Sequence, residues 1–195
     1  IEPLSVGHHA FTRSGAKDYL PATDQDRTAY QAACTELARK NPPLPHVEIL
    51  PGFNTQQVLN YGYRYWDEMF NQRQLLALST LAGGIQQLPA CAERDVLMVL
   101  FSGVLEFNNM FASYKGEGTG AVRHMFAHHI LKPERTPIEA NLWGTSKSSG
   151  SFSTLFESRI LRAVQYKDAP FETMVSRQNG KQAGRKIYGL SPRIA

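Results

Sequence analysis

Residues 91–113, CAERDVLMVLFSGVLEFNNMFAS, contain a continuous apolar run over 96–101 and further apolar residues as far as Phe111. The run alone would suit a buried strand as well as a helix. The later apolar residues keep a helical spacing, and Glu93 and Asp95 lie where the positive end of a helix dipole favours acidic side chains. The pattern predicts one helix over 91–113 that is buried on most sides and forms the centre of the core.

Other helices are predicted on both sides of this segment, and each begins at a residue type that caps helices. The first carries an apolar stripe that starts at Tyr30, the second covers 72–88 and the third covers 152–167. Helical turns are expected over 55–60 and 121–130, and Pro170 is expected to open a short final helix. The three capping residues are Thr23, which has Asp26 three positions later, Asn71 and Ser151.

Strand signals are few. Residues 8–23, HHAFTRSGAKDYLPAT, alternate loosely around a Ser-Gly pair and predict a small hairpin in which Phe11 pairs with Tyr19. The proline-rich stretch 41–52 interrupts regular structure and leaves room for one short strand over 47–50. The fold class that follows is mainly α, a helical bundle-like domain with a small N-terminal β-hairpin and long loops.

The expected organisation has three parts. A small β element or linker covers 1–22, a helical domain covers 23–176, and a basic C-terminal tail covers 177–195. The tail combines lysine and arginine with glycine and glutamine, which is typical of a solvated segment or of an arm that touches phosphates.

Composition limits the classes of function. The chain has 195 residues, of which 42% are hydrophobic, and a net charge of +4, which permits an anionic partner. No apolar run approaches the length of a transmembrane helix, so no membrane partner is expected. Cys34 and Cys91 lack the spacing of a disulfide framework or zinc knuckle, which predicts buried free thiols and a cytoplasmic location. The chain begins with Ile1 instead of Met, which is expected either for an excised piece of a longer protein or for a chain whose first residues are disordered or processed.

The stretch KGEGTGAVRHMFAHH, residues 115–129, looks at first like an active-site loop. Its glycines follow a Gly-x-Gly-x-Gly spacing, which differs from that of a dinucleotide-binding loop, and no Lys-Ser/Thr follows them as in a P-loop. His124 and His128 have the separation of a zincin pair, but Met125 stands where the catalytic glutamate should be. No metal is expected, although the two histidines with Glu117 or Glu139 keep a His-based metalloenzyme as an alternative.

Two interpretations of this loop stay open. Alternating glycines let backbone N–H groups converge on an anion, and Lys115 and Arg123 add charge, so a nucleic-acid phosphate is the natural ligand. Alternatively the glycines only let neighbouring helices pack closely, and Arg123 pairs with Glu106 or Glu117.

Two other stretches carry side chains that suit either structure or recognition. Asn108 and Asn109 lie inside a very apolar helix, where their amides would satisfy loop backbone groups or read a base edge. The aromatic residues of YGYRYWDEMF, residues 61–70, would form a half-buried cluster or stack on bases. In both cases the sequence favours the structural role.

Several stretches together resemble prokaryotic DNA methylases of the adenine-specific type, large S-adenosylmethionine-dependent proteins of which some bear a zinc ribbon. The stretches are WDEMFNQRQLLALSTL (66–81), FSGVLEFNNMFASYKGEGTGAVRHMFAHHILKPERTPIEANLWGT (101–145) and SGSFSTLFESRILRAV (149–164). In that family a helical region with a Trp-x-x-x-Phe-x-x-Arg-Gln-Leu-Leu pattern accompanies the methyltransferase fold. The resemblance covers residues 50–167, which is most of the helical body.

The departures from the family are informative. The Asp/Asn-Pro-Pro-Tyr/Phe/Trp tetrapeptide that holds the target amine is missing from this sequence, and so is the glycine loop for S-adenosylmethionine. The resemblance therefore implies a non-catalytic, DNA-contacting accessory domain, whose partners are DNA and the methyltransferase domain of the same longer chain. No cofactor is expected in this segment, and S-adenosylmethionine is expected for the full-length protein.

The candidate DNA contacts follow from charge, glycine content and placement in the resembling segment. The residues expected to touch phosphates are Lys115, Arg123 and Lys147, together with the amides of Gly116, Gly118 and Gly120. A second group consists of Arg73, Asn109, Asn141 and His128. A stand-alone nucleic-acid or nucleotide-binding helical module is the alternative function, because it would keep the basic loop without needing a methyltransferase partner.

Overall fold

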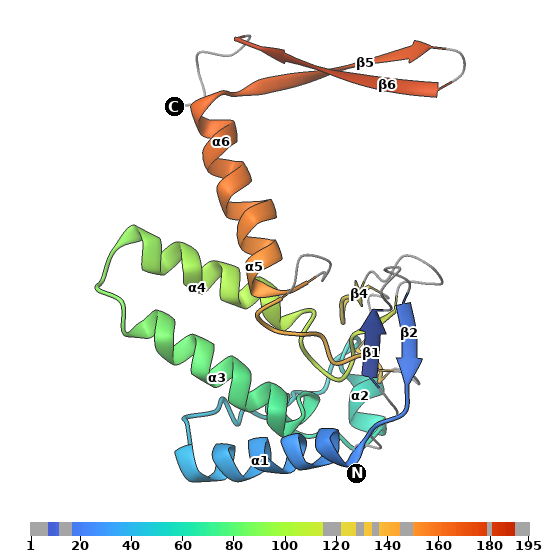
Figure 1. Cartoon of the computed structure of the whole chain (residues 1–195), viewed down its shortest axis with the longest axis vertical. Coiled ribbons are helices and arrows are strands. Elements are labelled where there is room, and N and C mark those ends of the chain that lie inside the picture. Colours follow the sequence, from blue (N-terminus) through green and yellow to red (C-terminus); the bar gives the residue numbers. More distant parts are fainter. Residues whose placement is uncertain are drawn as a thin grey trace.

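The structure, a computed structural model, describes residues 8–11, 17–114, 122–127, 131–133, 137–144, 150–178 and 181–189. The fold is mainly α, as the sequence predicts. Figure 1 shows α1, α3 and α4 in a stack, from which α5 and α6 leave as a helical arm that ends in β5 and β6. The elements are β1 (His8–Phe11), β2 (Lys17–Leu20), α1 (Asp24–Lys40), α2 (Gln56–Asn60), a 3₁₀ turn (Trp66–Met69), α3 (Gln72–Gln86), α4 (Ala92–Leu105), β3 (Ser113–Tyr114), β4 (Val122–Arg123), α5 (Phe152–Leu155), a π-helical segment (Phe156–Leu161), α6 (Arg162–Asp168), β5 (Phe171–Gln178) and β6 (Lys181–Tyr188).

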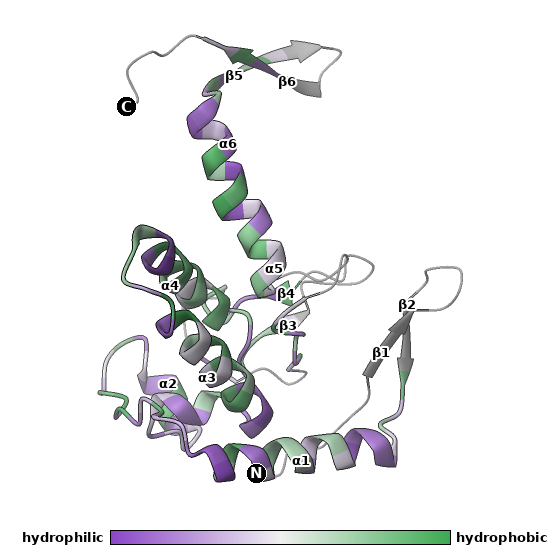
Figure 2. Cartoon of the chain, turned by 60° about the vertical axis from the view of Figure 1, so that its left-hand side comes forward, coloured by the Kyte–Doolittle hydropathy of each residue, from purple (hydrophilic) through white to green (hydrophobic). Residues whose placement is uncertain are grey.

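The main core lies between α3, α4 and the first turn of the arm. Figure 2 shows apolar residues concentrated on α3 and α4, whereas α1 is of mixed character. Each large apolar side chain that is fully buried contributes about 1.5–3 kcal/mol to stability, so this contact dominates the energetics of the body. The buried members are Leu78, Ile85, Leu100, Val104, Phe152 and Leu155.

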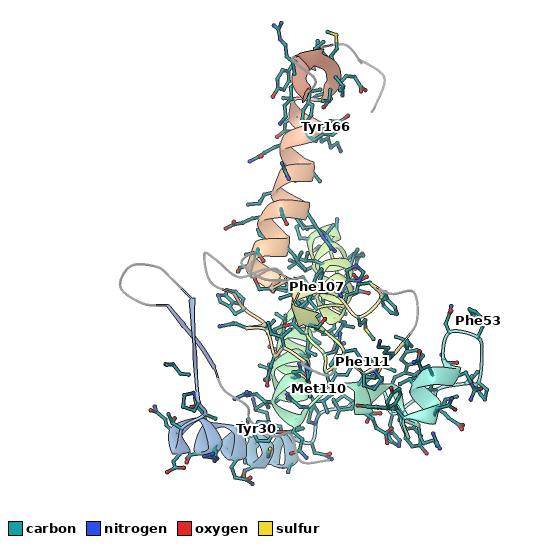
Figure 3. All side chains as sticks on the ribbon, turned by 90° about the vertical axis from the view of Figure 1, so that its right-hand side faces the viewer. Tyr30, Phe53, Phe107, Met110, Phe111 and Tyr166 are labelled. Carbon is teal, nitrogen blue, oxygen red and sulfur yellow. The ribbon has the colours of Figure 1, made fainter. Side chains whose placement is uncertain are left out.

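A second core lies beneath the aromatic segment 61–70. Its buried residues are Ile49, Val58, Met69, Phe111 and Leu131. Tyr63 meets Phe111 edge to face, with ring centroids 5.2 Å apart, and Trp66 packs against the same cluster. Figure 3 shows Phe111 and Met110 inside the body and Phe53 at its periphery. Tyr63 and Trp66 therefore have the structural role that the sequence favours.

The three predicted helix caps are confirmed. The Thr23 hydroxyl accepts from the backbone N–H of Asp26, and the Asp26 carboxylate accepts from the Thr23 N–H at 2.7 Å. Asn71 and Gln74 form the same reciprocal pair at the start of α3, at 2.8 and 2.9 Å. Ser151 accepts from the third backbone N–H of α5. Each cap satisfies N–H groups that have no partner inside the helix, which fixes where the helix begins.

The central helix is shorter than predicted, because α4 ends at Leu105 instead of continuing to residue 113. Asn108 donates to the carbonyl of Val104 at 2.9 Å, and Asn109 donates to the carbonyl of Leu105 at 2.7 Å. The Val104 carbonyl also accepts from the Asn108 backbone N–H at 3.2 Å, so the two amides add bonds to carbonyls of the last helical turn. The apolar pattern continues past Leu105, but the backbone no longer follows it.

The end of the chain also differs from the prediction, because no helix begins at Pro170. The arm is one continuous helical rod from α5 through the π-helical segment to α6, and a pair of antiparallel strands follows it. The sequence signal for these strands is the Asn-Gly dipeptide at 179–180, a pair that strongly favours a two-residue hairpin turn. The hairpin spans the position at which the basic tail was expected to begin.

Smaller β elements correct three further details. The N-terminal hairpin is confirmed, but His9 pairs with Tyr19, and Phe11 pairs with Lys17. The expected strand over 47–50 is a single bridge between Glu48 and Tyr65. The expected helical turn over 121–130 is wrong at its start, because Val122 and Arg123 form β4 and pair with β3.

The two cysteines differ in exposure. Cys34 is half-buried and Cys91, which precedes α4, is exposed, so the expectation of a buried thiol is wrong for Cys91.

Within the described ranges, none of the helices combines the length and the apolar character that crossing a bilayer requires.

Gly150 gives a direct test of the packing between α4 and the arm. Its φ is +72°, and an added Cβ would lie 2.5 Å from the Cβ of Phe107. Gly150→Ala should therefore lower the free energy of unfolding by roughly 3 kcal/mol, through positive-φ strain and overpacking. Urea denaturation measures the change. Gly84→Ala, in α3 and with no atom within 4 Å of the new Cβ, is the control and should be neutral or slightly stabilising. Equal unfolding midpoints for the two variants would contradict the packing described here.

Candidate functional site

A hollow of about 290 Å³ lies where the first turns of α3 meet the segment 139–142 and the residues just after α4. Both polar and apolar residues line this hollow. Its lining residues are Arg73, Gln74, Ala77, Leu78, Asn108, Glu139, Ala140, Asn141 and Leu142. Arg73 and Asn141, two of the predicted contact residues, are therefore brought together although they lie far apart in the sequence.

An ion pair forms one side of the rim. Arg73 Nε donates to Glu139 Oε1 at 2.6 Å, and Arg73 Nη2 donates to Glu139 Oε2 at 2.8 Å. Asn71 Nδ2 donates to the same carboxylate at 2.9 Å. This bonding to Glu139 raises the pKa of Arg73 above its ordinary value and anchors the segment 139–142 to the start of α3. The Arg73 charge is thus used within the protein, so a phosphate would have to compete with Glu139 for it.

Tyr30 of α1 supports this ion pair from outside the hollow. The Arg73 guanidinium lies over its ring, 5.4 Å from the centroid, which is a cation–π geometry. Burial raises the pKa of the Tyr30 hydroxyl above its ordinary value, and the neighbouring Cys34 adds to the effect. The contact ties α1 to α3 (Figure 3).

Two amides in the wall of the hollow are fixed in orientation and incompletely bonded. Gln74 Oε1 accepts from the Asn71 N–H at 2.9 Å, which leaves Gln74 Nε2 as a buried donor without a partner among the described residues. Asn108 Nδ2 donates to the carbonyls of Val104 and Gly150, at 2.9 and 3.0 Å, which leaves its Oδ1 as a buried acceptor without one. Buried polar groups are nearly always bonded, so these two atoms are exceptions in the packing beside the hollow.

Residues 139–142 line the hollow, and the chain continues from them through Trp143 to Gly144. Asn141 is exposed, and its Oδ1 accepts from the Gly144 N–H at 2.9 Å. Trp143 is 66% exposed and stacks on Phe152, with ring centroids 6.0 Å apart. The carbonyl of Leu142 accepts from the Phe152 N–H at 2.7 Å, so the rim is bonded directly to the base of the arm.

Asn109 has no surface to offer to DNA, which corrects its place among the predicted contacts. It is fully buried. Its Nδ2 donates to the carbonyls of Leu105 and Glu106, and its Oδ1 accepts from the Phe111 N–H at 2.8 Å. Both ends of the amide are used, so Asn109 shapes the chain after α4.

Other predicted residues lie around the glycine-rich segment. Arg123 is half-buried in β4, and the His124 ring meets Phe107 edge to face at 5.7 Å. Lys115, Gly116, Gly118, Gly120, His128 and Lys147 lie outside the described residues. Phosphate binding by this loop therefore stays a prediction. Within the described part of the chain, no three histidine, cysteine or acidic side chains gather as metal ligands would.

The terminal hairpin is a second candidate surface, which the sequence analysis did not anticipate as a folded element. Residues 171–188 contain four basic residues and one acidic residue. Arg185 is exposed, and Lys186 lies over the Phe171 ring at 4.1 Å. Phe171 also contacts Tyr166 of α6 and Tyr188 of β6, at 5.2 and 5.6 Å, which joins the hairpin to the arm. The Asn-Gly pair in the sequence was the signal that could have found it.

Comparison with known proteins adds no further constraint, because no family model matches the chain and no curated protein or solved structure is significantly similar to it. The hollow and the hairpin therefore carry the argument about function.

A double-mutant cycle tests the rim. Arg73→Ala, Glu139→Ala and their combination should give a coupling energy of about 1 kcal/mol in urea denaturation, because the bidentate pair is partly shielded from solvent and joins two segments distant in sequence. The control cycle is Arg39 with Glu36, which is also bidentate but is more exposed and lies within one helix, so its coupling should be smaller. A coupling at Arg73 and Glu139 no larger than the control would show that the rim is not held by this pair.

The raised pKa of Tyr30 predicts a pH dependence. Because the folded state holds the phenol proton more tightly than the unfolded state, its contribution to stability is present below the unfolded pKa of about 10 and is lost as pH rises through the folded pKa. The wild type should therefore lose more free energy of unfolding between about pH 9 and about pH 11 than Tyr30→Phe does. An identical loss in both proteins, measured by urea denaturation, would contradict the assignment.

Proposed function

We propose that this chain is a non-catalytic, DNA-contacting accessory domain of a larger methyltransferase-like protein. The observation that carries the proposal is the basic hairpin β5–β6, held at the end of the α5–α6 arm and away from the body (Figure 1). A contact element at this position reaches a duplex without bringing the acidic residues of the body close to the phosphates.

The shape of the hairpin suits duplex DNA. The major groove is about 12 Å wide and admits a two-stranded β-ribbon. Residues paired across an antiparallel ribbon share a face, and successive pairs alternate between the faces. The pairs Thr173–Lys186 and Met174–Arg185 are neighbours, so each face of the ribbon carries a basic residue. A ribbon with charge on both faces can meet phosphates on the two sides of a groove.

The marginal stability of the hairpin β5–β6 also supports a binding partner for it. An isolated two-stranded hairpin is marginally stable in water, and this one leaves Met174, Val175 and Tyr188 more than half exposed. A bound partner would add to the stabilisation that the aromatic contact at its base supplies. The surplus of basic residues in 171–188 favours a polyanion over an apolar protein surface.

Catalysis is assigned to the rest of the proposed longer chain. Binding of S-adenosylmethionine and transfer of its methyl group belong to the methyltransferase domain, whose Pro-Pro tetrapeptide and cofactor loop are missing from this sequence. A base inside a duplex has to leave the stack before an enzyme can modify it. A domain that grips the flanking duplex would hold the DNA in place while this happens.

The salt dependence of DNA binding tests the proposal. The affinity for a duplex of about 20 base pairs should fall steeply with salt concentration, because phosphate contacts release counterions. Arg185→Ala combined with Lys186→Ala should reduce the slope of log K against log salt by about two. Fluorescence anisotropy measures both quantities.

The matched control for this experiment is Arg39→Ala combined with Lys40→Ala at the end of α1, far from the hairpin (Figure 1). This variant removes the same charge and should keep the wild-type slope. Equal slopes for the two variants, or a wild-type protein that does not bind the duplex, would refute the proposal.

A further inference from the structure

We infer that a second copy of this chain packs antiparallel on the solvent-facing side of α4. The inference goes beyond the proposed function and does not rest on it. This side of α4 combines two exposed valines with an acidic group near one end and a basic group at the other, an order of charges that matches its own reverse.

The solvent-facing side of α4 is apolar at its centre. Val96 and Val99 are 40% and 73% exposed, although α4 is one of the helices that build the main core. Residues three and four positions apart share a helix face, so the two valines lie on the same side as Asp95 and Gly103. The apolar surface of this pair remains in contact with solvent in the single chain.

The arm places a basic group at the C-terminal end of this surface, where it leaves α4 (Figure 1). An added Cβ on Gly103 would lie 2.5 Å from Arg159 Nη1, so the guanidinium of Arg159 covers that glycine. Arg159 is exposed, and none of the ion pairs between described residues includes it. Its charge is therefore available to a partner.

An acidic group lies toward the N-terminal end of the same surface. The Asp95 side chain is 75% exposed, and its pair with Arg94 is long, at 3.8 Å. Asp95 and Gly103 are eight positions apart, about 12 Å along a helix. The guanidinium of Arg159, which covers Gly103, is therefore too far away to pair with Asp95 of its own chain.

Reversal of a second α4 about a two-fold axis brings the acidic and basic groups together. With the axis between residues 97 and 98, Val96 of each copy lies opposite Val99 of the other. Gly103 of one copy then lies three positions, about 4.5 Å along the helix, beyond the level of Asp95 of the other. Helical side chains tilt toward the N-terminus, which carries the Asp95 carboxylate toward the other copy's Arg159.

This arrangement selects a second copy over an unrelated partner. The two copies bury four valines in the middle of the contact and form one ion pair at each end. An unrelated protein would have to present the same order of charges around an apolar centre, whereas a second copy supplies it by symmetry.

The size of the contact predicts a weak dimer. Specific and stable interfaces bury about 1,200 Å² or more. One face of the 14 residues of α4, together with Arg159, provides less than this. We expect a dissociation constant of about 10–100 µM, which is typical of a reversible association.

Sedimentation velocity without DNA, over about 5–500 µM protein, measures the association. The wild type should pass from monomer to dimer in this range. Val99→Asp should weaken association by roughly tenfold or more, because it places a charge at the apolar centre. Val47→Asp changes an exposed valine outside α4, so it is the matched control and should associate as the wild type does.

Charge reversal tests the ion pair and the orientation. Arg159→Glu and Asp95→Lys should each weaken self-association by roughly tenfold, because each places like charges together at both ends of the contact. A one-to-one mixture of the two variants should associate with wild-type affinity, because opposite charges then meet at both ends. This recovery requires an antiparallel contact between two copies and cannot arise within one chain.

Three results would overturn the inference. They are a wild type that stays monomeric at about 500 µM, a dimer that Val99→Asp leaves unchanged, and a mixture that associates no better than the single variants. Arg159 and Asp95 are exposed, so their variants report on association even if Val99→Asp fails to fold. All of these measurements are made without DNA, so a failure here is distinguishable from a failure of the proposed function.

Discussion

The two buried amides that follow α4 are the constraint on which the rest of the structure depends. The side chains of Asn108 and Asn109 bond the carbonyls of Val104 and Leu105 where the helix ends, and the Val104 carbonyl also accepts from the Asn108 backbone N–H. Asn108 also bonds the carbonyl of Gly150, which fixes the start of the arm against the end of α4. This pair of side chains therefore lies where the central helix ends, and Asn108 also holds the start of the arm and lines the hollow.

This constraint explains what the sequence could and could not predict. Helix starts were predictable, because Thr23, Asn71 and Ser151 act through residues only three positions away. The end of α4 was not, because the apolar pattern continues while the asparagine side chains compete with the backbone. The ion pair of Arg73 with Glu139 joins residues 66 positions apart, so spacing could not reveal the hollow. The terminal strands carried a local signal, the Asn-Gly pair, which the basic composition obscured.

The hairpin and the hollow are two surfaces with different chemistry. Charge on an exposed ribbon gives affinity that depends on salt and not on sequence. The hollow beside α3 is small, about 290 Å³, and the Arg73–Glu139 ion pair holds one side of it. The two surfaces are linked, because the rim of the hollow is hydrogen-bonded to the first residue of the arm. This linkage suits an accessory domain that holds a duplex beside a catalytic domain.

Hydrogen exchange with and without duplex DNA tests the central claim most directly. Among the described residues, aromatic contacts of Phe171 with Tyr166 and Tyr188 join the hairpin to the arm, and a two-stranded hairpin is marginally stable alone, so its amides should exchange rapidly in the free chain. Mass spectrometry should show that peptides spanning 171–188 become strongly protected when DNA binds, while peptides from α1 do not change. Unchanged exchange in the hairpin, or protection confined to α1, would contradict the assignment of the arm as the DNA-contacting element.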